Sequence, residues 1–76
     1  MQTRNQKLIV TIDDQHLTRI QHVAHALAAA GMQIENVLPG SGIITGCISQ
    51  ELRSDLKTIE GVLAIETDTE MNALQH

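Results

Sequence analysis

Residues 7–31 read KLIVTIDDQHLTRIQHVAHALAAAG, and the spacing of the apolar side chains changes once within this stretch. Lys7 to Ile12 alternates with the period of two that is typical of a strand, and it is rich in β-branched residues. From His16 to Ala30 the apolar residues recur every three or four positions, which predicts a helix with one apolar stripe. Asp13-Asp14 offers capping oxygens between the two elements, and Gly31 is the expected end of the helix.

Two more strands follow, joined by a short turn. Met32 to Leu38 alternates again and is the predicted second strand. Pro39-Gly40-Ser41-Gly42 then breaks the pattern, because proline presets φ and glycine permits a positive φ in a tight turn. Ile43 to Ile48 is the predicted third strand. Strands joined by so short a loop pair antiparallel.

A second helix and a fourth strand complete the pattern. Ser49 is a good N-cap residue, and the apolar positions after it fall on one face at helical spacing: Leu52, Leu56 and Ile59. Val62 to Glu66 is the predicted last strand. The sequence thus predicts the order strand, helix, strand, strand, helix, strand.

This order predicts an α+β fold of the ferredoxin-like βαββαβ type. Right-handed crossovers place both helices on one face of a four-stranded antiparallel sheet, with the second and fourth strands at its edges. At 76 residues we expect one domain over residues 1–76, with a core over about 7–67 and a polar C-terminal tail over 68–76.

Composition restricts the function classes and the location. The chain has no Phe, Tyr or Trp, a net charge of −4 and only five Lys and Arg residues, which disfavours nucleic acid and an anionic membrane as partners. Cys47 is the single cysteine, so no intramolecular disulfide can form. The polar N-terminal residues lack the apolar stretch of a signal peptide, and we expect a cytoplasmic location.

The sheet face without helices is the predicted binding surface. Strand parity assigns Leu8, Val10, Ile12, Ile34 and Ile48 to the helix-covered side. The opposite parity assigns these residues to the open side: Ile9, Thr11, Glu35, Val37, Thr45, Cys47, Leu63 and Ile65. An open face normally alternates to polar residues, so the aliphatics retained here indicate an interface. A slip of one residue would exchange the two lists.

No group of residues predicts catalysis. His22 and His25 lie three apart on the predicted first helix, but off its apolar stripe and without a fixed third ligand, so we interpret them as solvated. Gly40-Ser41-Gly42 is followed by a strand, unlike a phosphate loop. No neighbouring base is evident for Cys47. We therefore predict no catalytic residue, no metal and no cofactor, and a binding module rather than an enzyme.

Three stretches of the sequence carry a family resemblance: Ser41-Gly42-Ile43-Ile44-Thr45-Gly46-Cys47-Ile48, then Leu52 to Ile59, then Gly61-Val62-Leu63-Ala64-Ile65-Glu66-Thr67-Asp68. With them, nearly the whole chain resembles the propeptide and inhibitor domains of subtilisin-like serine proteases. The resemblance implies that the open sheet face docks on a protease, with the C-terminal tail in its active-site cleft. It further implies that the partner-binding tail is Asn72, Ala73, Leu74, Gln75 and His76, with His76 at the primary specificity pocket.

A second resemblance remains open beside the first. Val23 to Glu35, VAHALAAAGMQIE, is similar to the first helix and second strand of ACT domains, although the usual Asp-x-x-Gly turn lacks its glycine here. This resemblance implies a regulatory domain that binds a small molecule as a homodimer. A self-associating domain without a ligand is the third alternative.

Overall fold

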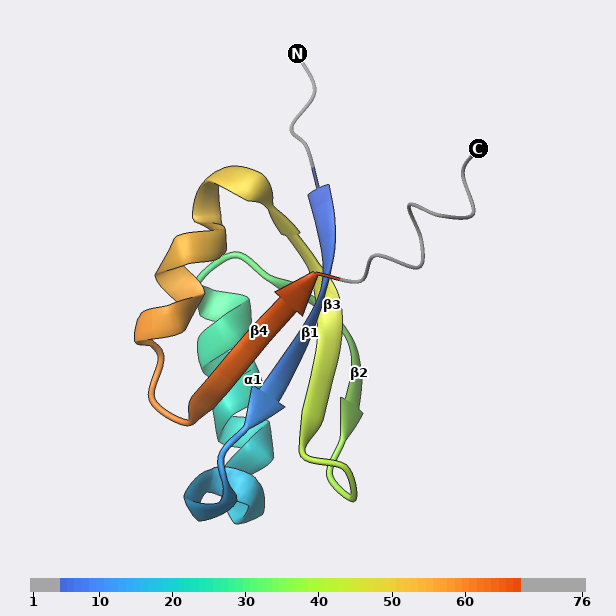
Figure 1. Cartoon of the computed structure of the whole chain (residues 1–76), viewed down its shortest axis with the longest axis vertical. Coiled ribbons are helices and arrows are strands. Elements are labelled where there is room, and N and C mark those ends of the chain that lie inside the picture. Colours follow the sequence, from blue (N-terminus) through green and yellow to red (C-terminus); the bar gives the residue numbers. More distant parts are fainter. Residues whose placement is uncertain (1–4, 68–76) are drawn as a thin grey trace.

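The computed structural model of the chain describes residues 5–67. Its elements are, in order, β1 (Asn5–Ile12), η1 (Asp14–Arg19), α1 (Ile20–Ala29), β2 (Gln33–Leu38), β3 (Ile43–Ser49), η2 (Gln50–Thr58) and β4 (Val62–Thr67). The four strands form one antiparallel sheet in the order β2-β3-β1-β4, and α1 and η2 lie on the same side of it (Figure 1). The predicted ferredoxin-like α+β fold, with β2 and β4 at the edges, is confirmed.

The two predicted helices differ in detail from the expectation. The first begins as a 3-10 helix, η1, and becomes α-helical at Ile20. The side chain of Asp13 caps η1 by accepting a hydrogen bond of 3.0 Å from the backbone N–H of His16. The second helix, η2, is a 3-10 helix throughout, and its predicted N-cap residue, Ser49, accepts from the backbone N–H of Glu51. 3-10 turns are common at helix ends, as η1 is here, whereas the nine residues of η2 form an unusually long 3-10 run.

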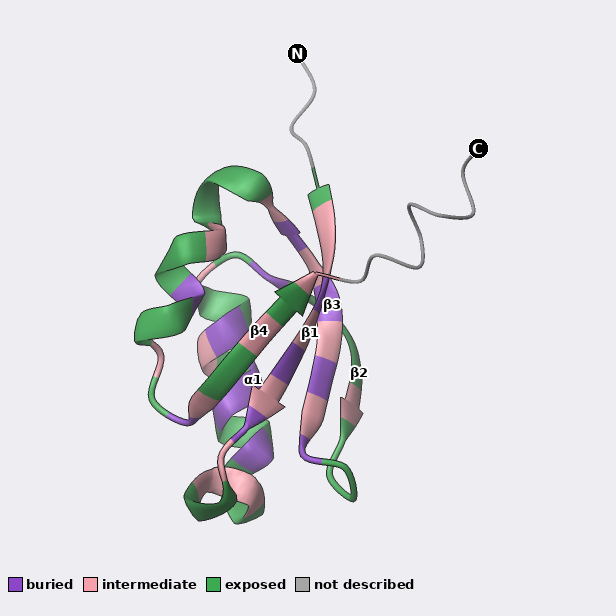
Figure 2. Cartoon of the chain, viewed as in Figure 1, coloured by how far each residue is buried: buried purple, intermediate pink, exposed green. Residues whose placement is uncertain are grey.

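The core lies between the sheet and α1 with η2, and it is built without aromatic side chains. Figure 2 shows buried residues on α1 and on the central strands β1 and β3. The buried apolar residues are Leu8, Val10, Ile12, Ile20, Val23, Ala24, Leu27, Met32, Ile44, Ile48 and Leu56. This confirms the predicted inward parity of β1, and Ile34 packs against the same cluster while partly exposed.

Each edge strand contains an irregularity that changes its parity. The register of β2 against β3 shifts between Ile34 and Asn36, which leaves Glu35 as an extra residue. The register of β4 against β1 shifts in the same way and leaves Leu63 unpaired. A bulge inserts one residue into the period of two, so every later side chain changes face.

The predicted placement of Val37 and Ile65 on the open face is therefore wrong. Both side chains follow a bulge, and both pack against the core on the helix-covered side. The predicted tail, residues 68–76, lies outside the described residues.

Candidate functional site: the open face of the sheet

The open face is the side of the sheet away from α1 and η2 (Figure 1). Residues paired directly across neighbouring strands point to the same side, so the register defines which side chains share it. The pair Asn5–Ser49 lies at one end of the open face, and the rest of the face consists of Lys7, Ile9, Thr11, Gln33, Glu35, Asn36, Leu38, Ile43, Thr45, Cys47, Leu63, Ala64 and Glu66. These residues form three rows that cross the strands.

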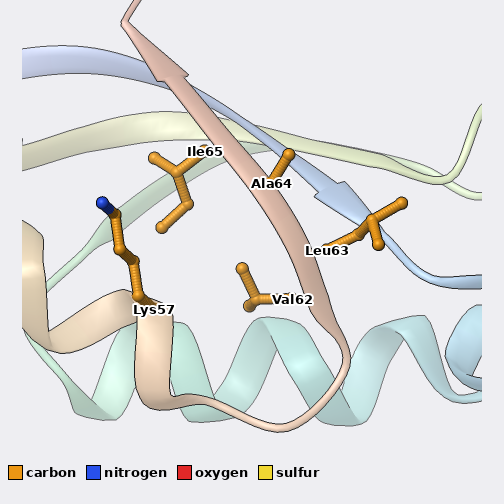
Figure 3. Close-up of a pocket in the computed structure, with 5 residues that line it drawn as sticks. All are labelled: Lys57, Val62, Leu63, Ala64 and Ile65. Atoms are coloured by element: carbon orange, nitrogen blue, oxygen red, sulfur yellow. The ribbon is translucent and has the colours of Figure 1, made fainter.

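The row near the β2–β3 turn is apolar. Leu38 pairs with Ile43, Ile43 with Thr11, and Thr11 with Ala64, so four side chains from four strands lie in one line. The bulged Leu63 lies beside Ala64 and points away from Val62 and Ile65 (Figure 3). Leu38 is 44% exposed and Leu63 is 67% exposed. We call these five residues the apolar row.

The row at the other end of the open face is polar. Lys7 Nζ donates to Oε1 of Glu35 at 2.7 Å, and Cys47 Sγ donates to Oε2 of the same carboxylate at 3.5 Å. Between the polar end and the apolar row lies a mixed row, in which Asn36, Thr45, Ile9 and Glu66 pair in that order. The open face therefore changes from charged to apolar along the direction of its strands.

The polar end has little capacity for chemistry. The hydrogen bond from Lys7 holds the pKa of Glu35 below its ordinary value. Burial, and then the hydrogen bond to Glu35, raises the pKa of the Cys47 thiol. Because the thiolate is the reactive form, this environment keeps Cys47 a poor nucleophile at neutral pH.

Six of the predicted residues lie on the open face: Ile9, Thr11, Glu35, Thr45, Cys47 and Leu63. Lys7 and Ile43 were not among the predicted residues, although they share parity with the predicted residues of their own strands. Leu38 and Ala64 do not share such a parity, because they follow the bulges. The predicted tail residues, Asn72 to His76, lie outside the described part of the chain.

Grooves run along both edges of the sheet. One, of about 170 Å³, lies between η2 and β4 and is lined by Lys57, Val62, Leu63, Ala64 and Ile65 (Figure 3). Another, of about 330 Å³, lies between α1 and β2 and is lined by Gln21, Ala24, His25, Ala28, Ile34 and Val37. Each of these two grooves has a single ionisable side chain in its lining, so neither assembles an acid–base pair.

Residues 5–67 contain neither a cluster of metal ligands nor a membrane-spanning helix. Within residues 5–67, no group of three or more His, Cys, Asp or Glu side chains is placed to hold a metal ion. No helix in this range has the length and apolar character needed to cross a membrane.

Comparison with known proteins gives one informative similarity. No protein-family model matches the chain, and no curated protein matches it at a significant level. Among solved structures, the chain is similar to the solution structure of NapD, an E. coli Tat proofreading chaperone protein. The TM-score is 0.75 and the identity is 20%, over 90% of this chain and 79% of NapD. At this identity the similarity shows a common fold.

Proposed function

We propose that this chain is a small protein-binding module that docks a polypeptide partner on the apolar row of its open face. The observation that carries the proposal is the alignment of Leu38, Ile43, Thr11 and Ala64 across all four strands, with Leu63 beside them. Contiguous exposed apolar surface often marks a protein interaction site. Contact with an apolar segment would remove these side chains from water.

The dimensions of the apolar row suit a peptide segment. Four strands give three spacings of about 4.8 Å, so the row is about 14 Å long. A segment of this length corresponds to about nine residues of helix or about four residues of strand. The polar end, with Lys7 paired to Glu35, lies on the same face beyond the mixed row, and its charged groups would help to fix the orientation of a bound segment.

Two independent similarities support a protein partner. NapD, which has the same fold, is a proofreading chaperone, and we infer a chaperone-like role for this chain from that likeness together with the apolar row. The resemblance to subtilisin propeptides assigns docking to the same sheet face, with a subtilisin-like protease as the partner. The two alternatives share the surface and differ in the partner.

Site-specific photo-crosslinking tests the proposed surface. A photoreactive amino acid such as p-benzoylphenylalanine would replace Leu38 or Leu63, and the matched control would carry it at His22 on the exposed side of α1. In the producing cell, we expect the same polypeptide adduct from Leu38 and Leu63 and none from His22. Equal adducts from all three positions, or none from the two leucines, would contradict the proposal.

Two further assays separate the partners. Inhibition of a subtilisin at micromolar concentration by the full chain, lost on removal of Asn72 to His76, would identify the protease alternative. A stable homodimer whose unfolding temperature rises with an amino acid would identify the ACT-like alternative, because a ligand that binds only the folded state stabilises it. A monomer inert in both assays, with an adduct at the apolar row, fits the chaperone-like role.

A further inference from the structure

His16 lies between two carboxylates that belong to different segments of the chain. Its Nδ1 is 2.7 Å from Oδ1 of Asp13, the residue between β1 and η1. Its Nε2 is 3.5 Å from Oε2 of Glu60, in the loop between η2 and β4. The His16 side chain is 21% exposed, whereas that of Glu60 is 89% exposed. One imidazole therefore links the start of η1 to the residues that precede β4.

Two more contacts hold the same segments together. The backbone N–H of Asp13 donates to the carbonyl oxygen of Gly61 at 3.0 Å. The imidazole of His16 lies so close to Gly61 that a Cβ built there would be 3.0 Å from its Cγ atom. The Asp13–His16 segment is thus joined to Gly61 by one backbone hydrogen bond and by the His16 ring.

The geometry also determines which ring nitrogen loses its proton. Oδ1 of Asp13 accepts from the backbone N–H of His16 and faces Nδ1, so Nδ1–H is retained as a donor to this carboxylate. The proton that leaves is then the one on Nε2. Its loss leaves a lone pair directed at the Glu60 carboxylate, so an attraction is replaced by a repulsion.

We propose that His16 is a pH-sensitive latch between η1 and the start of β4. When His16 is protonated, it bridges Asp13 and Glu60. When it is neutral, in the Nδ1–H tautomer, it keeps its hydrogen bond to Asp13 but no longer attracts Glu60, so the segment that follows Glu60 is held less tightly. Among residues 5–67, these two carboxylates are the charged groups that act on the ring.

The titration behaviour of the pair agrees with this geometry. The hydrogen bond to Asp13, with a smaller contribution from Glu60, raises the pKa of His16 above its ordinary value. The same hydrogen bond lowers the pKa of Asp13. Both shifts favour the imidazolium–carboxylate form of the latch.

The latch lies close to the apolar row. Leu63 follows Gly61 by two residues, at the bulge where β4 begins to pair with β1. Release of Glu60 would loosen the end of β4 that presents Leu63. This consequence for docking rests on the proposed function, whereas the latch itself does not.

NMR of the full chain tests the latch without a partner. We expect the ring ¹⁵N shifts of neutral His16 to report the Nδ1–H tautomer. As His16 deprotonates, the amides of Gly61, Val62 and Leu63 should exchange with solvent faster than their intrinsic pH dependence predicts. His22 and His25, on the exposed side of α1, are internal references.

Substitution of Glu60 distinguishes a histidine that links η1 to the start of β4 from one that only contacts the Asp13 cap of η1. Glu60→Gln should lower the titration midpoint of His16 and remove the excess exchange, while leaving the tautomer unchanged; the matched control, Glu51→Gln, should change neither. An Nε2–H tautomer in wild type, or excess exchange that persists in Glu60→Gln, would overturn the proposal. Amide exchange at residues 61–63 that follows its intrinsic pH dependence throughout the titration would also overturn the proposal.

Discussion

Lys7 on β1 and Glu35 on β2 form an ion pair of 2.7 Å that passes over β3, the strand between them. Glu35 lies two residues after Gln33, which pairs with Cys47, so strand alternation places its side chain on the open face. Cys47, on the intervening strand, donates to the other oxygen of the same carboxylate. The ion pair and the thiol therefore lie at one end of the open face, and the apolar row lies at the other.

Removing the Glu35 carboxylate should make Cys47 more reactive. In wild type, burial and then the hydrogen bond to Glu35 raise the pKa of the thiol, while Lys7 opposes the shift. In Glu35→Gln, the hydrogen bond from the thiol to the Glu35 carboxylate is lost, whereas Lys7 still lowers the pKa of the thiol. Alkylation by iodoacetamide at mildly alkaline pH, followed by mass spectrometry, should be measurably faster than in wild type and in the control Glu66→Gln. An unchanged rate in Glu35→Gln would show that the carboxylate does not act on the thiol.

Gly46 should not tolerate a side chain. A Cβ at this position of β3 would collide with the backbone carbonyl of Gln33 in β2, which cannot rotate away as a flexible side chain could. Gly46→Ala should lower the free energy of unfolding by about 1–3 kcal/mol, the usual cost of overpacking. Gly40→Ala is the control, because nothing lies within 4 Å of the added atom. Urea unfolding measures both, and equal stabilities would refute the close approach of β2 and β3.

Truncating leucines should distinguish the core from the docking surface. Leu27 is 0% exposed, so Leu27→Ala should cost about 2–5 kcal/mol of unfolding free energy. Leu63 is 67% exposed, so Leu63→Ala should change stability by about 0.5 kcal/mol or less. Denaturant unfolding gives both values. A large cost at Leu63 would mean that it supports the fold and is not held available for a partner.

The free energy of unfolding should be highest at an intermediate pH and should fall at both lower and higher pH. The pKa of His16 is raised, so its contribution is complete below the ordinary value of 6.5 and is lost as the pH rises through the folded-state pKa. The pKa of Asp13 is lowered, so its contribution is present above 3.8 and is lost as the pH falls through the folded-state pKa. Urea unfolding across this range should show both losses. His16→Gln should abolish the alkaline loss, and its persistence in that variant would assign the loss to another group.

The sequence predicted the parts of the fold that depend on periodicity. Leu8, Val10 and Ile12 alternate without interruption, so their burial followed directly from the pattern. The bulges at Glu35 and Leu63 left no comparable signal, because the extra residue is defined by pairing with a neighbouring strand and not by its own residue type. The parity of the side chains was therefore predicted correctly on the central strands and incorrectly beyond each bulge.

The affinity of the photo-crosslinked partner for variants of the apolar row tests the central claim most directly. Leu38→Lys and Leu63→Lys each place a charge on an exposed position of that row, and His22→Lys places the same charge on the exposed side of α1. Isothermal titration calorimetry should show binding at least about tenfold weaker for the two leucine variants, a loss of about 1.4 kcal/mol, and unchanged for His22→Lys. Equal affinities for wild type and all three variants would contradict docking on the apolar row.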